Sequence, residues 1–414
     1  MSVASEAAKQ SEAAEQHQAA ETRSREHRAI GVASGAHALH DGYTDLIYVM
    51  LPIWQSEFGL GYAALGLLRT CYSGTMAGLQ IPSALLSERL GVPLVLAVGT
   101  ALSGIGYLIA GTSAGFVMLI VALLVGGLGS STQHPLASAL VARAFAGPRS
   151  LKALGTYNFA GDIGKMSVPA LASLLLVVMA WRPVVGILGL CGIVAAVAIY
   201  ALTPRFAAEA TPAAVGDDKA AVAAPAGSRR RFGFPLLLAI GMVDSGTRMG
   251  LLIFLPFILI GKGAALPTVG LALTLIFAGG AVGKLVCAFI GARLGVIGTV
   301  CLTEGLTTVG ILALLPLPLE AAMVLLPVIG VMLNGTSSVL YGSVPELVEP
   351  EKRTRMFGIF YTGTIGSGAV SPALYGLVGD AFGVTVAVCV VAGLCLLTLP
   401  LAVALRPALP ESAR

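Results

Sequence analysis

The sequence predicts an all-α polytopic membrane protein with twelve transmembrane helices in two pseudo-symmetric six-helix bundles. Of the 414 residues, 56% are hydrophobic and only 11% are charged, a composition that excludes a water-soluble globular domain. From Ile30 onward, apolar stretches of about 20 residues recur, each long enough to cross a hydrocarbon core about 30 Å thick. A polar segment near the middle of the chain separates six of these stretches from six more.

The apolar stretches divide the chain into five regions. Residues 1–29 are rich in Ala, Glu and Gln and lack the apolar core and cleavage site of a signal peptide. The segment before Gly233 is rich in Ala and Pro, as in a linker. We therefore expect a cytosolic N-terminal tail (1–29), an N-terminal bundle (30–203), a cytosolic linker (204–233), a C-terminal bundle (234–406) and a cytosolic C-terminal tail (407–414). The expected spans are 30–55, 61–86, 92–111, 114–141, 151–178, 183–203, 234–260, 267–291, 295–316, 319–345, 354–379 and 384–405.

Lys and Arg residues gather in alternate loops, as expected for the cytoplasmic side of a membrane protein. The opposite loops carry only Arg182 and Lys262. We therefore expect a multi-pass protein of the bacterial inner membrane with both termini in the cytoplasm. The net charge of +4 then follows from membrane topology, and we expect no nucleic-acid partner.

Two sequence patterns indicate how the helices pack. A weak repeat relates span five to span eleven at a constant offset, as in a protein with two equivalent halves: Gly155 with Gly358, and Pro169-Ala170-Leu171 with Pro372-Ala373-Leu374. Small residues four positions apart let helix backbones approach closely. We predict such packing at Gly31 and Gly35, Gly74 and Gly78, and Gly279 and Gly283.

Ionisable residues within the apolar stretches are the main functional candidates. At bilayer depth such residues are costly, so they face the bundle interior or a water-filled cavity. The basic ones are Arg69, Lys165, Arg248 and Lys284, and the acidic ones are Asp41, Asp45, Asp162, Asp244 and Glu304.

The first span carries a polar stripe. His37, Asp41 and Asp45 recur every four residues and so share one helix face, and at about 1.5 Å per residue Asp41 lies near the midplane. A carboxyl group in such a place can load and release protons near neutral pH. We therefore predict that Asp41 binds a proton with His37 and Asp45 beside it, and that Asp45 pairs with Arg69. The alternative is that these side chains only hold neighbouring helices together.

The spacing of the other charges predicts further ion pairs. Asp162 and Lys165 are three residues apart, and Asp244 and Arg248 are four apart, so each pair can form within one helix. Lys284 and Glu304 are expected at similar depth on neighbouring helices, and we predict a structural ion pair between them. Alternatively, such pairs only neutralise buried charge and have no role in function.

Lys165 and Arg248 are expected near the midplane in opposite bundles, which places two cations across a central cavity and suits an anionic ligand. Pro135 removes a backbone donor next to His134 and leaves carbonyl groups free to line this cavity. Asn334 begins a polar run that lines it from the other bundle or holds helices together. The predicted ligand-binding residues are Arg248, Lys165, Arg69, His134, Asp162, Asp244 and Asn334.

The loop after span two resembles a motif of the major facilitator superfamily. It reads Ser87-Glu88-Arg89-Leu90-Gly91, and its counterpart Gly291-Ala292-Arg293-Leu294-Gly295 keeps the Arg and Gly without the acid. Val92 and Pro93 stand where the family motif usually has basic residues. The resemblance extends over the chain from about Ile30 and implies the two-bundle fold.

Three further segments resemble the fosmidomycin-resistance branch of this superfamily, a group of drug exporters: His37-Ala38-Leu39-His40-Asp41, the run from Pro52 to Leu60, and Ser130-Ser131 with His134-Pro135. The resemblance implies proton-driven antiport, and hence efflux, of a small anionic or amphipathic compound. Asp162 and Lys165 stand where small or amide residues are expected in that branch. The substrate of the branch is therefore not transferred to this chain.

The sequence also leaves another function open and disfavours two more. An uptake symporter or exchanger for an organic or inorganic anion would have the same fold and the same cations. A channel is disfavoured because the buried charges form no repeated ring, and an enzyme is disfavoured because no nucleophile with a base appears. The six cysteines have no metal-binding spacing and are interpreted as small buried apolar residues. We expect a monomer with a small-molecule substrate, protons and the lipid bilayer as partners, and no cofactor or metal.

Overall fold

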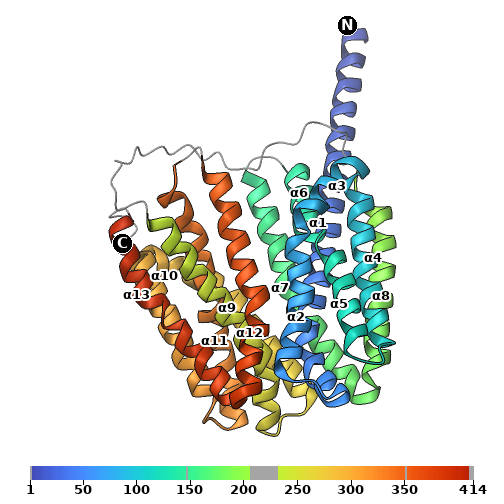
Figure 1. Cartoon of the computed structure of the whole chain (residues 1–414). Helices are drawn as coiled ribbons and strands as arrows, with labels where there is room; N and C mark the ends of the chain where they lie inside the picture. The colour runs from blue at the N-terminus through green and yellow to red at the C-terminus, as the bar shows by residue number, and fades with distance from the viewer. Residues whose placement is uncertain (1, 146–147, 206–231, 350–351, 410–414) are drawn as a thin grey trace.

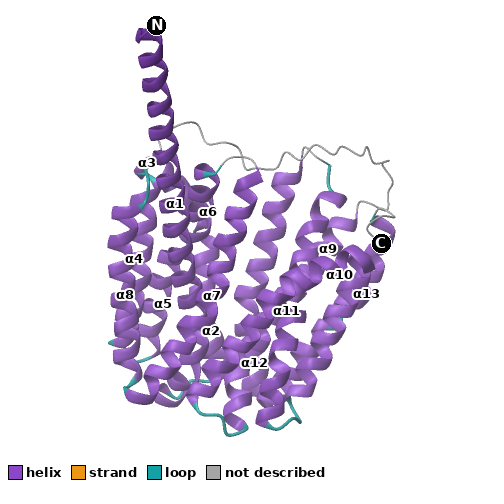
Figure 2. Cartoon of the chain, turned by 180° about the vertical axis from the view of Figure 1, so that it is seen from behind, coloured by secondary structure: helices purple, strands orange, loops and turns teal. Residues whose placement is uncertain are grey.

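The computed structural model describes residues 2–145, 148–205, 232–349 and 352–409, in which the regular structure is helical throughout (Figures 1 and 2). Helices α1–α8 form one bundle and α9–α13 form a second bundle beside it. The expected linker and C-terminal tail lie mostly outside the described residues. The helices are α1 (Ser2–Phe58), α2 (Tyr62–Gly78), α3 (Gln80–Leu90), α4 (Val92–Gly111), α5 (Phe116–Ser130), α6 (Gln133–Ala144), α7 (Pro148–Val178), α8 (Trp181–Leu202), α9 (Gly233–Gly261), α10 (Leu266–Leu314), α11 (Leu319–Leu347), α12 (Arg353–Cys395) and α13 (Thr398–Leu405).

Nine helical segments of the described chain are long and apolar enough to cross a membrane. The last of them, Arg355–Ala408, contains two of the expected spans. Spans one and two, in α1 and α2–α3, are not among the nine. The physical reason is that α1 carries the polar stripe, and that span two is divided at Leu79 into helices of 17 and 11 residues.

The first helix is longer than the first expected span. It runs without a break from Ser2 to Phe58, so the expected tail and span one form one helix whose N-terminal part projects beyond the bundles (Figure 1). Near the point where it enters the bundle, the Glu26 carboxylate accepts a hydrogen bond from Arg149 Nη2 on α7 at 2.6 Å.

Glycines with positive φ separate consecutive spans at equivalent places in the two halves. Gly91 (φ 85°) ends α3, and Gly295 (φ 68°) interrupts α10 at the boundary between two expected spans. Each follows an Arg-Leu pair in the motif found after spans two and eight. Residues with a side chain rarely adopt this backbone conformation. This explains why a glycine follows the Arg-Leu pair in both halves.

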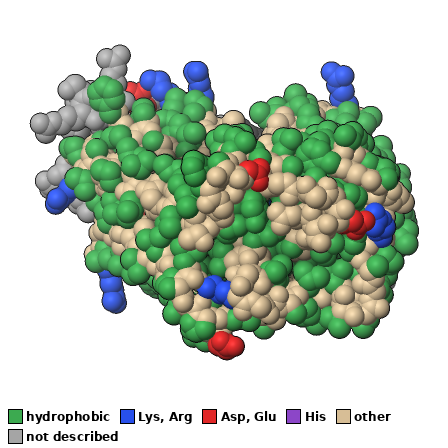
Figure 3. Space-filling view, turned by 60° about the horizontal axis from the view of Figure 1, so that its bottom comes forward, with side chains coloured by type: hydrophobic (Ala, Val, Ile, Leu, Met, Phe, Trp, Pro, Cys, Tyr) green, Lys and Arg blue, Asp and Glu red, His purple; other side chains and the backbone are tan. Residues whose placement is uncertain are grey.

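The surface of the helices is mainly apolar, as a lipid environment requires. Large side chains such as Val324, Val178 and Phe289 are more than 70% exposed. The face shown in Figure 3 is mostly hydrophobic, with few Lys, Arg, Asp or Glu side chains. The charged residues of the spans therefore lie inside.

The two bundles meet through α2 against α12 and α7 against α10. On α12, the Pro372 carbonyl faces Gly66 of α2 so closely that a Cβ added there would lie 2.2 Å from its oxygen. On α7, Pro169 occupies the matching place, since a Cβ on Gly270 of α10 would lie 3.2 Å from its carbonyl oxygen. The sequence repeat therefore marks equivalent contacts between the halves.

Only one of the three predicted glycine pairs packs tightly. A Cβ on Gly279 or Gly283 would lie 2.0 Å or 2.3 Å from a carbonyl oxygen of α11. The prediction is wrong for the other two pairs, because Gly31, Gly35, Gly74 and Gly78 have no described atom within 4 Å of an added Cβ. Spacing identifies small residues on one helix face but not whether that face meets another helix.

Candidate functional site

A cavity of about 310 Å³ lies between the bundles and is lined by both. Among the candidate residues, His37 and Glu304 do not line it. The others do: Asp41, Asp45, Arg69, His134, Asp162, Lys165, Asp244, Arg248, Lys284 and Asn334. The buried charges of the two bundles thus converge on one cavity.

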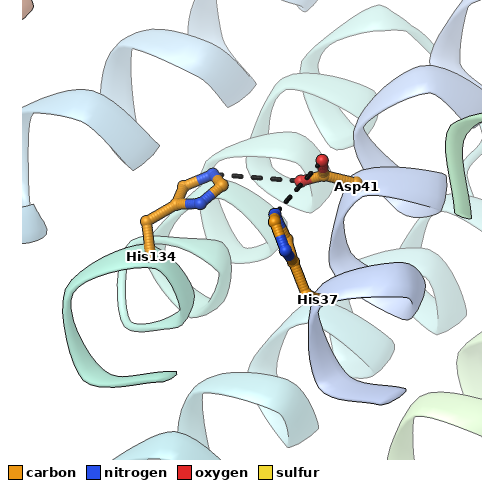
Figure 4. Close-up of side chains that lie close together, drawn as sticks. All are labelled: His37, Asp41 and His134. Atoms are coloured by element: carbon orange, nitrogen blue, oxygen red, sulfur yellow. Dashed lines mark ion pairs between the residues drawn. The ribbon is translucent and has the colours of Figure 1, made fainter. Parts of the chain in front are cut away.

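Asp41 lies at the centre of the charged groups contributed by the N-terminal bundle. Its Oδ2 is 3.2 Å from Lys165 Nζ and 3.3 Å from His37 Nε2, and its Oδ1 is 3.9 Å from His134 Nε2. Figure 4 shows the two imidazoles pointing at this carboxylate. The predicted pair between Asp162 and Lys165 is wrong, because Lys165 reaches from α7 to α1 instead of along its own helix.

His37 is oriented by its second ring nitrogen. Nδ1 donates to the Tyr157 carbonyl at 2.9 Å, and the rings of His37 and Tyr157 stack with centroids 4.1 Å apart. With Nδ1 as the donor, Nε2 of the neutral ring faces Asp41 without a proton, so a further proton would create a charged hydrogen bond between them. Gly161 on α7 leaves room for this contact, since a Cβ there would lie 2.7 Å from the imidazole.

His40 differs from His37 in having a structural environment. It is 2% exposed, and its nitrogens contact the hydroxyls of Ser130 at 3.3 Å and Thr100 at 3.0 Å. Its polar atoms are therefore satisfied within the N-terminal bundle, away from Asp41.

An ion pair joins the two bundles across the cavity. Lys284 on α10 contacts both carboxylate oxygens of Asp162 on α7, at 2.7 and 2.6 Å. The predicted pair of Lys284 with Glu304 is therefore wrong. Position along the sequence predicts the membrane depth of Lys284, Asp162 and Glu304. Which of the two acids Lys284 contacts depends on how the two bundles pack against each other.

Two other predicted pairs form as expected. Arg248 Nη2 contacts Asp244 Oδ2 at 2.8 Å along α9. Arg69 Nη2 on α2 lies 3.9 Å from Asp45 Oδ1 on α1, and the guanidinium also donates to Ser73 and lies 5.0 Å from the centroid of the Tyr48 ring. Of these contacts, those with Asp45 and Tyr48 link α2 to α1, whereas Ser73 lies on α2 itself.

The cavity is balanced in formal charge. Each of its four cations has a carboxylate partner: Arg69 with Asp45, Lys165 with Asp41, Arg248 with Asp244, and Lys284 with Asp162. The two cations that were expected to face an anion, Lys165 and Arg248, are thus both neutralised by acids. A charged ligand must compete with an internal partner.

His37, Asp41 and His134 could also hold a metal ion, because each offers one ligand atom and all three atoms lie within 4.8 Å of one another. However, the Lys165 ammonium group already contacts Asp41 and supplies the positive charge that a metal ion would bring. The donor set therefore fits a proton and an ion pair better than a metal.

The bundles also meet at the end of the molecule opposite to the chain termini, called here the far end. There, Asp380 on α12 accepts hydrogen bonds from the backbone N–H groups of Tyr62 and Ala63 at 2.5 and 3.0 Å. Gly61, the N-cap of α2, has no side chain to do this, and a Cβ there would lie 2.7 Å from Asp380 Oδ1. A carboxylate from one bundle thus caps a helix of the other. No signal in the sequence singled out Asp380, because it falls between the expected spans 354–379 and 384–405 and so outside the apolar stretches.

We expect Asp380→Ala to open the far end more often. Loss of a helix cap costs about 1 kcal/mol, which corresponds to about a fivefold change in population. In a cysteine-free background with Met249→Cys in the cavity, an impermeant thiol reagent applied from the far-end side should label this variant faster. The matched control is Glu320→Ala, which removes another exposed carboxylate near the same end. Equal labelling of the two variants would contradict the role of Asp380.

Two helical bundles around a central charged cavity define a polytopic membrane protein of the secondary transporter type. The family model of the Major Facilitator Superfamily matches residues 34–247 and 237–414. The chain therefore belongs to this superfamily, and the predicted all-α fold is confirmed.

Curated relatives are similar over parts of the chain. The fosmidomycin resistance protein of Escherichia coli (strain K12) is 32% identical over 149 residues, which is 36% of each chain. The drug efflux pump JefA of Mycobacterium tuberculosis is 28% identical over 141 residues, 34% of this chain and 28% of that one. The aligned regions thus span about a third of these relatives. The first relative agrees with the resemblance seen in the sequence motifs.

A solved structure is similar over nearly the whole chain. It is a bacterial homolog of the human lysosomal transporter Spinster in an inward-facing and occupied conformation, with a TM-score of 0.75 and 15% identity. The similarity covers 93% of this chain and 97% of that one. At this identity it supports the fold alone.

Proposed function

We propose that the protein exports a small anionic compound in exchange for protons, by alternating access to the cavity between its bundles. The observation that carries this proposal is that four acid–base pairs from two similar bundles face one common cavity. Burying such pairs is costly and seldom needed for stability alone. Rocking of the bundles about this midplane site would expose it to each side of the membrane in turn.

An anion would bind by displacing a carboxylate from its cation. Lys165 in one bundle and Arg248 in the other, each now paired with an aspartate, are the proposed contacts. A carboxylate that loses its cation in a desolvated place binds a proton more readily. Anion binding and proton binding are thus linked through the same ion pairs, with Asp41 as the proposed carrier of the proton.

Export is proposed because two of the relatives are named for drug efflux and fosmidomycin resistance. We further propose that the protein lies in the bacterial inner membrane with both termini in the cytoplasm. We also propose that it is a monomer and that the chain divides into the five regions expected from the sequence. In this orientation the far end faces outward, and the contacts at Asp380 close the outer side.

Uptake of an anion together with protons is a second candidate, and the Asp41–Lys165 pair favours it. Because the anion competes with Asp41 for Lys165, anion binding promotes protonation of Asp41, so both ligands tend to be bound together. Exchange instead requires that the cavity holds the anion when it opens to one side of the membrane and the proton when it opens to the other side.

Uptake into proteoliposomes under an imposed pH gradient separates these two functions. Labelled fosmidomycin, chosen from the name of a relative, is tested beside simple organic anions and cations. Exchange for protons predicts accumulation in vesicles that are acidic inside, whereas cotransport predicts accumulation when the outside is acidic. Preference for cations in counterflow would contradict both candidates.

We expect Arg248→Ala and Lys165→Ala each to weaken binding of the transported anion by about 30-fold or more, since loss of a desolvated charge contact costs about 2 kcal/mol or more. The measurement is the concentration that half-saturates counterflow. Lys152→Ala, an exposed lysine on the same helix as Lys165, should behave as the wild type. Unchanged affinity in either cavity variant would remove that residue from the site.

A further inference from the structure

Glu304 is a buried acid outside the predicted site. It lies on α10 and is 1% exposed. Its Oε2 accepts a hydrogen bond from the Cys395 thiol at 3.0 Å, and its Oε1 is buried with no hydrogen-bond partner among the described residues. A buried carboxylate oxygen without a donor is costly, so the ionised form of this side chain is poorly accommodated here.

A second carboxyl group lies beside it. Asp244 on α9 is close enough to Glu304 for their side chains to form a hydrogen bond once one of them carries a proton. Two ionised carboxylates have only acceptor atoms, so no hydrogen bond can form between them without that proton. With both acids ionised, Glu304 Oε1 has no partner among the described residues.

The surrounding elements supply too little positive charge for two carboxylates. On α9, Arg248 contacts Asp244 at 2.8 Å. From α11, Thr336 approaches Glu304, and the phenol of Tyr341 lies near Asp244 and Arg248. From α12, the titratable neighbour is the Cys395 thiol. Arg248 can therefore neutralise one acid, and no further ion pair to either acid is found within the described part of the chain.

We propose that Asp244 and Glu304 share one proton and form a second proton-binding site, located in the C-terminal bundle. The proton lies between the two carboxyl groups and supplies the donor that Glu304 Oε1 lacks. One negative charge then remains on the pair, and Arg248 balances it. The N-terminal site differs, because Asp41 already has Lys165 as its own counter-ion.

The geometry also gives this proton a route to water. Asp244 lines the cavity, whereas Glu304 lies behind it and does not. A proton therefore enters and leaves through Asp244. An anion that draws Arg248 away from Asp244 would leave both acids without a cation, so the pair would hold its proton more tightly. This coupling step rests on the cotransport candidate of the proposed function, in which the anion and the proton are bound together, but the shared proton itself rests on neither candidate.

Infrared spectroscopy of the purified full-length protein tests the shared proton directly. A protonated carboxyl group has a C=O stretching band that an ionised carboxylate lacks, and this band shifts in heavy water. At neutral pH we expect the wild type to show such a band and Glu304→Gln to lose it. The matched control is Glu320→Gln, an exposed acid on α11, which should keep the band. A band that is equally strong in Glu304→Gln would overturn the proposal.

Two further variants test the sharing of the proton and exclude misfolding. A separate transport measurement tests the proposed function. Asp244→Asn should shift or remove the band, because Glu304 loses the carboxylate that shares its proton and Arg248 loses its partner; an unchanged band would overturn the sharing. Glu304→Asp should retain a band, which excludes general disruption as the cause of its loss in Glu304→Gln. Proton exchange measured with fosmidomycin in proteoliposomes is a separate readout. Absence of proton-coupled transport for fosmidomycin and for every organic anion tested beside it would reject the proposed function, while the infrared result still decides the shared proton.

Discussion

Replacing Asp41 with Asn is expected to abolish transport driven by a pH gradient while counterflow of the same substrate continues. Counterflow needs only binding and reorientation, whereas accumulation against a gradient needs a group that exchanges a proton in each cycle. Asn keeps the shape of the side chain but cannot be ionised. The expected result is thus loss of all pH-driven accumulation, measured in proteoliposomes beside counterflow in the same preparation.

A purely structural role for Asp41 would give a similar loss for a different reason. Removing this carboxylate leaves Lys165 without the partner 3.2 Å away, and an uncompensated buried charge costs about 3–5 kcal/mol. The double variant Asp41→Asn/Lys165→Gln restores charge balance and separates the two cases. If Asp41 carries the proton, the double variant stays uncoupled; recovery of pH-driven transport in it would reject this role.

The convergence of charges on one cavity could be predicted from the sequence, because an ionised group in lipid has few other places to go. The pairing could be predicted only where it lies within one helix at favourable spacing, as for Asp244 with Arg248. Lys165 also has an acid nearby on its own helix, yet it contacts Asp41 on α1. Close packing at Gly161 and Gly164 brings α7 near enough to α1 for that contact.

Contacts between the bundles were beyond sequence reasoning for a related cause. Lys284 meets Asp162, and Asp380 caps α2, only because two separate bundles adopt a particular relative position. No spacing within one helix encodes that position. The fold can be predicted from the length of the apolar stretches and from the sequence repeat. Which residues pair across the interface between the bundles depends on tertiary packing.

The same distinction bears on the proposed movement. Asp41 with Lys165 and Asp244 with Arg248 each lie within one bundle, so each pair can move as a unit. Asp162 with Lys284, Asp380 with the start of α2, and Gly66 with Pro372 join different bundles. Rocking must therefore alter these three contacts while it leaves the first two intact.

Replacing Gly66 with Ala is expected to disfavour closure of the far end and so to slow transport strongly. The added Cβ would lie 2.2 Å from the Pro372 carbonyl oxygen and 2.7 Å from Ala373 Cα, which are backbone atoms that cannot rotate away. Overpacking of this kind costs about 1–3 kcal/mol, or about a 5- to 150-fold change in the ratio of the two orientations. The measurements are counterflow rate and labelling of Met249→Cys from the far-end side.

The same contact can be tested from its other side and against a matched control. Gly376 on α12 faces the Tyr62 carbonyl of α2, with an added Cβ 2.4 Å from the oxygen, so Gly376→Ala should have the same effect. Gly74→Ala lies two turns further along α2, where no described atom is within 4 Å of the added Cβ. This variant makes the same change in helix propensity without the collision and should transport normally. Normal transport by Gly66→Ala and Gly376→Ala as well would mean that α2 and α12 need not meet during the cycle, and the proposed outer closure would be abandoned.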